Sequence, residues 1–315
     1  MEAASNFPLG FGEKTVGTMR YYEPLAEFGP RRPPQESLVD KFGGLPWGLD
    51  PAAWPRCSAC GGVQTHLAQL SHHPERLDLG EPGRVLLLFM CYHDPGGCPS
   101  WGAGEGANAC LILEACRIGV GLTPPHGEAP TALEAVVVDW AEKDDGIPPE
   151  RYGDFFDESV LYGRYTVEEI CAIPHGTKLG GVPSWEQSSE QGPPPPWRFA
   201  LQLSEWVDCL GPPPEPEEIG RPVSYEIGGR RWEQRPAAPR RPFAEEILSK
   251  LRALFPSRPP WKPYVHEPRR TVEETGFFVR DDGWSVQTAD FAYGTAYVFL
   301  RTDRDPPEAA LFWQR

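Results

Sequence analysis

Features that would tie a protein to a membrane or to a nucleic acid are missing from this 315-residue sequence. No apolar run approaches the roughly 20 residues that a helix needs to cross a bilayer. The first residues, MEAASNFPLGFGEK, lack the basic and apolar segments of a secretory signal. Positive charge is in deficit, with 45 acidic against 30 basic residues and a formal net charge of −15. We therefore expect a cytoplasmic protein that binds neither nucleic acid nor membrane, and whose charge serves either solubility or a basic protein partner.

Motifs of common enzyme families are also absent. The sequence has no H-E-x-x-H, no G-x-G-x-x-G and no G-x-S-x-G pattern. The seven histidines are scattered, and His175 is interpreted as a loop residue. No catalytic or cofactor-binding residue can be assigned, which favours a protein that is not an enzyme. Catalytic groups need not be close in sequence, so an enzyme of unknown reaction remains the alternative.

What the sequence does contain is a set of three short patterns that each occur twice, in the same order. The pairs are KFGGLPW (41–47) with KLGGVPSW (178–185), HLAQLSH (66–72) with FALQLSE (199–205), and the apolar runs that follow Gly83 and Gly294. Two copies are too few for a solenoid, so they indicate one internal duplication. The Gly pairs are interpreted as tight turns that the following Trp anchors on the core.

Composition and patterning predict a β-rich α+β fold, in which a β unit is duplicated and helices are few and short. The 38 prolines and 33 glycines argue against long helices. We expect an irregular entry segment (1–40), a first repeat with the candidate zinc site (41–140), an acidic loop with a short helix (141–177), and a second repeat (178–315). The second repeat carries Pro-rich insertions and an amphipathic helix at 243–255.

Short apolar runs bounded by turn residues predict the strands, and one capping signal predicts a helix. Thr166 followed by Glu169 matches a capping box, so a short helix should begin there. The acid-rich span 139–158 is expected to be a loop with one helical turn. The predicted strands are 65–70, 85–91, 109–115, 135–139, 276–280, 295–301 and 310–313.

Four cysteines of the first repeat have the arrangement of a metal site. Cys57 and Cys60 form a C-x-x-C-G turn, and Cys91 and Cys98 follow as a second, looser pair. Four thiolates from two turns are typical of a structural zinc site, which has no open position for a reacting water. Ordinary thiols and a redox pair are the alternatives. One histidine could replace a cysteine ligand: His93, His72 or His73. The other cysteines are expected in the core: Cys110, Cys116, Cys171 and Cys209.

These patterns resemble two families. The order K-[FL]-G-G-x-P-x-W, L-x-Q-L, an apolar strand and a C-terminal Phe-Trp-Gln is similar to the YwqG-like bacterial family, a domain of unknown function. The first repeat also resembles the N-terminal part of the programmed cell death protein 2 family, in which a CxxCG turn and a cysteine-bearing strand follow the KxGGxPxW pattern. The resemblance implies a β-rich duplicated fold and, for the second family, chaperoning of a new ribosomal protein. The second repeat lacks the matching cysteines.

The expected function is therefore a non-enzymatic, zinc-stabilised module that binds a basic protein, in the manner of a chaperone. Two alternatives remain at this point. One is an immunity or antitoxin protein that neutralises a basic toxin, and the other is an enzyme with its site between the repeats.

Overall fold

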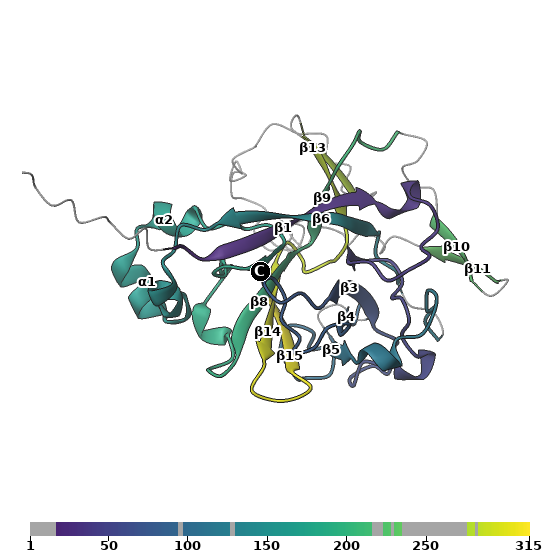
Figure 1. Cartoon of the computed structure of the whole chain (residues 1–315), viewed down its shortest axis with the longest axis horizontal. Coiled ribbons are helices and arrows are strands. Elements are labelled where there is room, and N and C mark those ends of the chain that lie inside the picture. The colour runs from purple at the N-terminus through teal and green to yellow at the C-terminus, as the bar shows by residue number, and fades with distance from the viewer. Residues whose placement is uncertain are drawn as a thin grey trace, which may run out of the picture.

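The computed structural model describes residues 17–93, 97–126, 130–215, 223–227, 230–234, 276–280 and 283–315. These residues form a β-rich fold with a few short helices (Figure 1). The amphipathic helix expected at 243–255 lies outside the described residues. Within them, no helix has the length and apolar character needed to cross a membrane.

Ten strands form the main path of one antiparallel sheet, and its two edge strands lie close to one another. The sheet is therefore nearly closed, and the apolar side chains inside it form the largest core cluster. The strands, in their order across the sheet, are β15 (Glu308–Gln314), β14 (Thr295–Arg301), β8 (Arg198–Ser204), β7 (Lys178–Gly180), β1 (Arg20–Phe28), β6 (Ala135–Asp144), β2 (Lys41–Phe42), β3 (Thr65–Ser71), β4 (Val85–Met90) and β5 (Asn108–Leu113).

Three strands branch from this path, and one hairpin is separate. β1 pairs in parallel with β9 (Trp206–Cys209), which continues through β13 (Gly283–Gln287) to β12 (Phe277–Arg280). In Figure 1 these strands rise above the main sheet. The separate hairpin pairs β10 (Val223–Ile227) with β11 (Arg230–Gln234).

Among the described residues, the two α-helices and the longest 3₁₀ turn lie between the two regions of repeated sequence. The capping box predicted at Thr166 is confirmed, because its side chain accepts from the Glu169 amide while the Glu169 side chain accepts from the Thr166 amide. Asp157 caps the preceding helix. The helices are α1 (Glu158–Arg164) and α2 (Val167–Cys171), with 3₁₀ turns η1 (Gly29–Arg31), η2 (Pro51–Ala53), η3 (Ala115–Arg117), η4 (Pro149–Phe156) and η5 (Ser189–Gln191).

The predicted strands are present, with ends that differ by a few residues. The largest difference is in β6, which was expected to end at Asp139 and continues to Asp144. It continues because β1 pairs along its whole length. β1 itself lies in the segment 1–40, which was expected to be irregular, and its Pro24 and its charged residues concealed it. β1 and β6 are remote from each other in the sequence, so no local sequence pattern predicts that they pair.

On either side of the β1–β6 pair, the strand order repeats. β2 lies beside β6 and β7 lies beside β1, and each is a short strand that starts with a lysine. In both, the lysine pairs in register with a buried glutamine of the next strand, Gln69 or Gln202. One further strand and an edge strand follow on each side. The recurring sequence patterns therefore occupy matching positions in the sheet.

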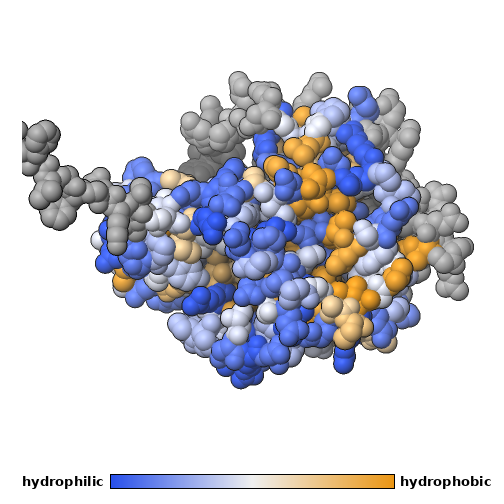
Figure 2. Space-filling view, viewed as in Figure 1, coloured by the Kyte–Doolittle hydropathy of each residue, from blue (hydrophilic) through white to orange (hydrophobic). Residues whose placement is uncertain are grey.

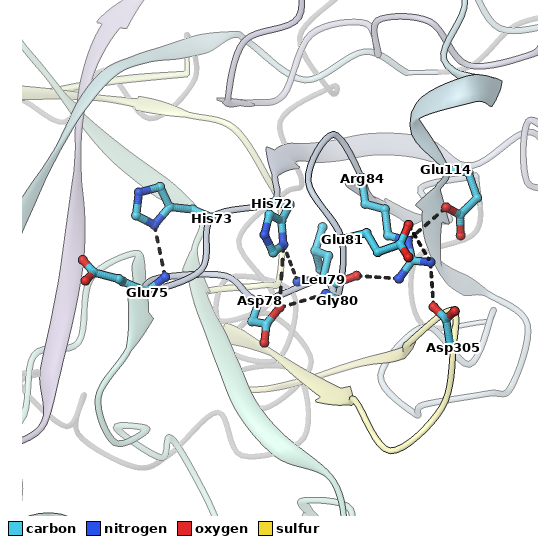
Figure 3. A network of polar contacts seen from close by, with 10 residues as sticks. All are labelled: His72, His73, Glu75, Asp78, Leu79, Gly80, Glu81, Arg84, Glu114 and Asp305. Atoms are coloured by element: carbon cyan, nitrogen blue, oxygen red, sulfur yellow. Dashed lines mark hydrogen bonds and ion pairs between the residues drawn. The ribbon is translucent and has the colours of Figure 1, made fainter.

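The β5 and β15 edges are joined at one end by Arg84 (Figure 3). Its guanidinium is buried and donates to Glu114 at 3.0 Å, at the end of β5. It also donates to Asp305 at 2.6 Å, just before β15. A third bond reaches the Leu79 carbonyl at 3.0 Å. A charged bond on each side makes Arg84 a clasp between the two ends of the sheet.

Candidate metal centre

The first half of the cysteine cluster is a tight turn between two short antiparallel segments. The Cys57 amide donates to the Gly62 carbonyl at 2.8 Å, and the Gly61 amide donates back to the Cys57 carbonyl at 2.9 Å. Gly61 has a φ of +73°, which a residue with a side chain rarely adopts. The Gly62 amide donates to the Cys60 sulfur at 3.4 Å. The C-x-x-C-G sequence therefore forms the knuckle that was predicted from it.

The second half is a loop that leaves β4 and returns as β5. Cys91 directly follows β4, and its amide donates to the Ala107 carbonyl at 2.8 Å. Cys98 lies on the returning side, where its carbonyl accepts from the Ser100 amide at 2.8 Å. The Asn108 side chain donates to the Ser100 carbonyl at 2.8 Å. The long gap between Cys91 and Cys98 is therefore closed by neighbouring backbone contacts.

The four sulfurs of Cys57, Cys60, Cys91 and Cys98 all lie within 4.8 Å of one another. The Cys60 and Cys91 sulfurs are 3.6 Å apart. Tetrahedral zinc with bonds of about 2.3 Å places its sulfurs roughly 3.8 Å apart, so the spacing fits a metal of this size. All eight cysteines are free thiols. Three of the four clustered thiols are buried and Cys60 is exposed, so the cluster lies just below the surface.

The histidines that could have replaced a cysteine are engaged elsewhere. His93 Nε2 lies 2.9 Å from the Val63 carbonyl. His72 Nδ1 accepts from the Leu79 amide at 3.0 Å, and His73 Nδ1 accepts from the Glu75 amide at 3.3 Å (Figure 3). Among the described residues the converging ligand atoms are the four thiols, and none of these histidines belongs to the group.

The remaining cysteines do not form a second group. Cys209 is buried and Cys110 is half-buried, as expected of core residues. Cys116 and Cys171 are exposed, so the prediction that they belong to the core was wrong. Cys116 lies on the 3₁₀ turn η3 and Cys171 ends the short helix α2, and neither element has a buried face at that position.

Burial of the cluster makes metal binding compete with protons. It raises the pKa of Cys91 to about 11, and it also raises the pKa of Cys98. For Cys57, burial acts to raise the pKa, but hydrogen bonds from the backbone of Cys60 and Ala59 outweigh it and lower the pKa. Thiols with raised pKa values are protonated at neutral pH without a metal. Binding must release those protons, so the affinity falls as the pH falls.

The cluster lies beside the contact between β5 and β15, at the end opposite to Arg84. The Trp313 amide of β15 donates to the Trp101 carbonyl at 3.1 Å, and its indole donates to the Ser100 hydroxyl at 3.4 Å. Both acceptors follow Cys98 by two or three residues. The β5–β15 seam is thus held by Arg84 at one end and by the cysteine loop at the other.

Three buried polar arrangements were not predicted from the sequence. Ser184 Oγ lies 2.6 Å from His175 Nδ1, and Ser184 is 3% exposed. Lys41 and Lys178, the lysines that begin the two repeated patterns, are both fully buried. A lysine precedes each Gly pair, and this recurrence could have indicated the buried lysines. A charged residue in a short motif is normally expected to be exposed, so the sequence did not predict their burial.

No protein-family model, curated protein or solved structure matches this chain. The site is therefore interpreted from its own geometry.

Proposed function

We propose that this chain is a zinc-stabilised, non-enzymatic module of the cytoplasm that binds a basic protein. The observation that carries the proposal is the convergence of four thiols from two turns. Four protein sulfurs occupy all four coordination positions of a tetrahedral metal ion and leave none for a water or a substrate. Such a site holds structure together, and free thiols suit a reducing compartment.

The metal would act on the closure of the sheet. It would join the Cys57–Cys60 turn to the loop that contains Cys98, and that loop accepts the hydrogen bonds of Trp313. Thiolate ligands favour zinc over magnesium or calcium, which prefer oxygen. Zinc bound here would thus keep β15 against the first half of the chain.

Metal analysis of the purified protein tests this part. We expect about one zinc per chain, and loss of that zinc in the Cys57→Ser/Cys91→Ser variant. The matched control is Cys116→Ser/Cys171→Ser, which removes two exposed thiols outside the cluster. Equal metal content in the two variants would show that the cluster is not the binding site.

The partner class rests on charge. The formal net charge is −15, and the β1–β6 ribbon exposes Asp139, Glu142 and Asp144 on β6. Figure 2 shows the same face of the molecule, largely hydrophilic over its left and central parts. Part of the acidic segment is used internally, because Asp145 accepts from the Ile147 and Val182 amides. The exposed acids of β6 are therefore the better candidates for a docking surface.

Matched charge reversals test the partner. Asp139→Lys/Glu142→Lys changes the ribbon by four charges, and Asp303→Lys/Glu308→Lys makes the same change at the β14–β15 hairpin, on the opposite side of the molecule in Figure 1. Cross-linked partners from the host should be basic proteins. Their association with the purified chain should slow with salt and with the ribbon variant only. Equal slowing in both variants would reduce the role of the acids to overall charge.

We further propose that the two halves descend from one duplicated unit, as in the families that the sequence resembles. The support is a set of matched contacts. Gln69 accepts from the Trp47 amide at 2.7 Å, and Gln202 accepts from the Ser184 amide at 2.8 Å. The amide of Ser71 donates to Asp40, and the amide of Ser204 donates to Thr177. A chaperone for a basic client and a protein that neutralises a basic toxin share this surface chemistry, and the identity of the captured partner separates them.

An enzyme is the weaker alternative. Among the described residues, Ser184 and His175 are a serine and a histidine within hydrogen-bond distance, but the Ser184 backbone is bound on both sides, by Gln202 and by the Tyr297 hydroxyl. With 3% of Ser184 exposed, a substrate has no approach to its hydroxyl.

A further inference from the structure

Lys178 is a fully buried amine for which the described residues provide no hydrogen-bond partner. It begins β7, the three-residue strand that joins β1 to β8. A buried ammonium without a bonded partner is among the costliest arrangements in a protein, because it loses its hydration and gains nothing in return. The environment of Lys178 therefore favours the neutral amine.

Lys41 occupies the matching position of the other half and has the opposite solution. Its ammonium donates to the Gln35 side chain at 2.7 Å and to Glu134 at 3.3 Å. Lys41 and Glu134 are both buried, so each charge has a partner at hand. Burial still lowers the pKa of Lys41, against the opposing pull of Glu134. The lysine at this position therefore has hydrogen-bond partners in the first half and none among the described residues in the second half.

The groups that face Lys178 come from β1 and from the end of β6. The Tyr21 ring centre is 5.5 Å from the amine nitrogen, and Glu23 lies on the same strand. Asp145 is the carboxylate with the larger charge interaction with Lys178, but it accepts from the Ile147 and Val182 amides. Glu23 is paired with Lys143. Both acids attract an ammonium at Lys178, but each already accepts other hydrogen bonds and neither bonds to the amine.

We propose that Lys178 is an acid-sensitive latch: the amine is neutral while the Gly180–Gly181 turn is closed, and its protonation opens that turn. Opening lets the ammonium reach water or Asp145. Opening would also break two hydrogen bonds: the one from the Val182 amide to Asp145 at 2.9 Å and the one from the Ser184 amide to Gln202 at 2.8 Å. These two amides report whether the latch is closed.

The direction of the pH effect follows from linkage. Burial lowers the pKa of Lys178 to about 7, with Asp145 and Glu23 opposing the change. In an open turn the amine has its ordinary pKa of about 10.4. The open state binds more protons between these two values, so opening becomes more favourable as the pH falls from about 10 to 7, and its dependence on pH ends below 7.

Hydrogen exchange of the 178–186 peptide at pH 6 and pH 9 tests the latch, after correction for the intrinsic exchange rate. The linkage predicts that the open fraction is roughly 100-fold larger at pH 6 than at pH 9. Lys178→Met should remove this ratio and protect the peptide at both pH values. Lys41→Met, the matched variant, should leave the ratio of the 178–186 peptide unchanged. An unchanged ratio in Lys178→Met would overturn the proposal.

A second measurement does not depend on any variant. The chain has only six lysines, so ¹³C-labelled lysine gives few ε-carbon signals to follow by NMR. One signal should titrate near pH 7, that of Lys178, and the signal of Lys41 should also lie below the ordinary lysine range because burial lowers its pKa. If all resolved signals titrate near pH 10, Lys178 is charged in the folded protein and there is no latch.

Discussion

The turn after Lys41 and the turn after Lys178 have the same backbone conformation. They differ in the charged and metal-binding groups that lie near them. Both Gly pairs have positive φ, from +65° to +72°, and both turns are fastened by a buried glutamine. In the first half the lysine donates to Glu134, and four cysteines converge from the turn before β3 and from the loop between β4 and β5. In the second half the lysine has no hydrogen-bond partner among the described residues, and the sequence from Lys178 onward contains one cysteine, Cys209. The difference teaches that one backbone framework can be stabilised by a metal and an ion pair, or by apolar packing.

The apolar packing of the second half is unusually aromatic. Trp185 stacks on Phe299 and Phe312 with interplanar angles of 17° in each case, and Tyr297 lies over Phe312. Trp47, its counterpart in the first half, is buried, and no aromatic ring of the described residues stacks on it. Aromatic clusters of this kind contribute about 0.5–1.5 kcal/mol per pair beyond area burial. The second half thus has its own means of fixing the strand that follows the turn.

The largest expected effect breaks the comparison at the metal. Structural zinc contributes about 10–16 kcal/mol of apparent binding free energy in zinc-finger peptides. That is as large as the roughly 5–15 kcal/mol that separates a typical folded domain from its unfolded state. We expect Cys57→Ser to abolish the hydrogen-exchange protection of β4 and β5, and Cys116→Ser to leave it intact. If β8 and β14 lose protection to the same extent, the two halves fold as one unit and the comparison holds only for their local contacts.

The next effect contrasts the two lysines at pH 7. Lys41→Met removes a buried partner of Glu134 and should lower the free energy of unfolding by about 3 kcal/mol. Lys178→Met removes an amine whose pKa burial lowers to about 7, and should raise stability by at most about 4 kcal/mol. Urea unfolding with zinc present measures both. The gain from Lys178→Met should fade as the pH rises toward 10, and a gain that is constant with pH would have to come from packing alone.

A smaller effect, equal in the two halves, is expected at the glutamines. Gln69→Leu leaves the Trp47 amide and the Val39 carbonyl without their bonds, and Gln202→Leu does the same to the Ser184 amide and the Gly176 carbonyl. Buried groups left in this way cost about 1–3 kcal/mol. Each variant should therefore lose about 2 kcal/mol in urea unfolding. A loss confined to one half would mean that the turns are alike in shape but not in energy.

The smallest effect supplies the scale for the others. Thr166 caps α2, which belongs to neither repeated region. Replacing an N-cap Thr by Ala costs about 1 kcal/mol. Thr166→Ala should lower the free energy of unfolding by that amount without changing the zinc content. A loss as large as that of Gln69→Leu would place the helices between the two halves within the same cooperative core.

Local features of the sequence were sufficient wherever neighbours in the chain determine the structure. The strands from Thr65 to Leu113, the strand from Thr295 to Arg301 and the capping box at Thr166 are each set by short apolar runs, turn residues or a four-residue hydrogen-bond pattern. The cysteine knuckle belongs to the same class, because Cys57 to Gly62 close on themselves. The two patterns at Lys41 and Lys178 begin short strands at matching places in the sheet, β2 beside β6 and β7 beside β1.

The sequence by itself therefore determined the β-rich character, the turns and the set of cysteines that could meet. The tertiary structure alone decided that β1 lies at the centre of the sheet, because its partner β6 is more than a hundred residues away. It also decided that β5 and β15 meet, and that Cys98 reaches the other three thiols despite its loose spacing. Most of all, it decided which lysine has a carboxylate beside it. Burial and pairing depend on distances between remote segments, and these determine whether a buried amine is charged.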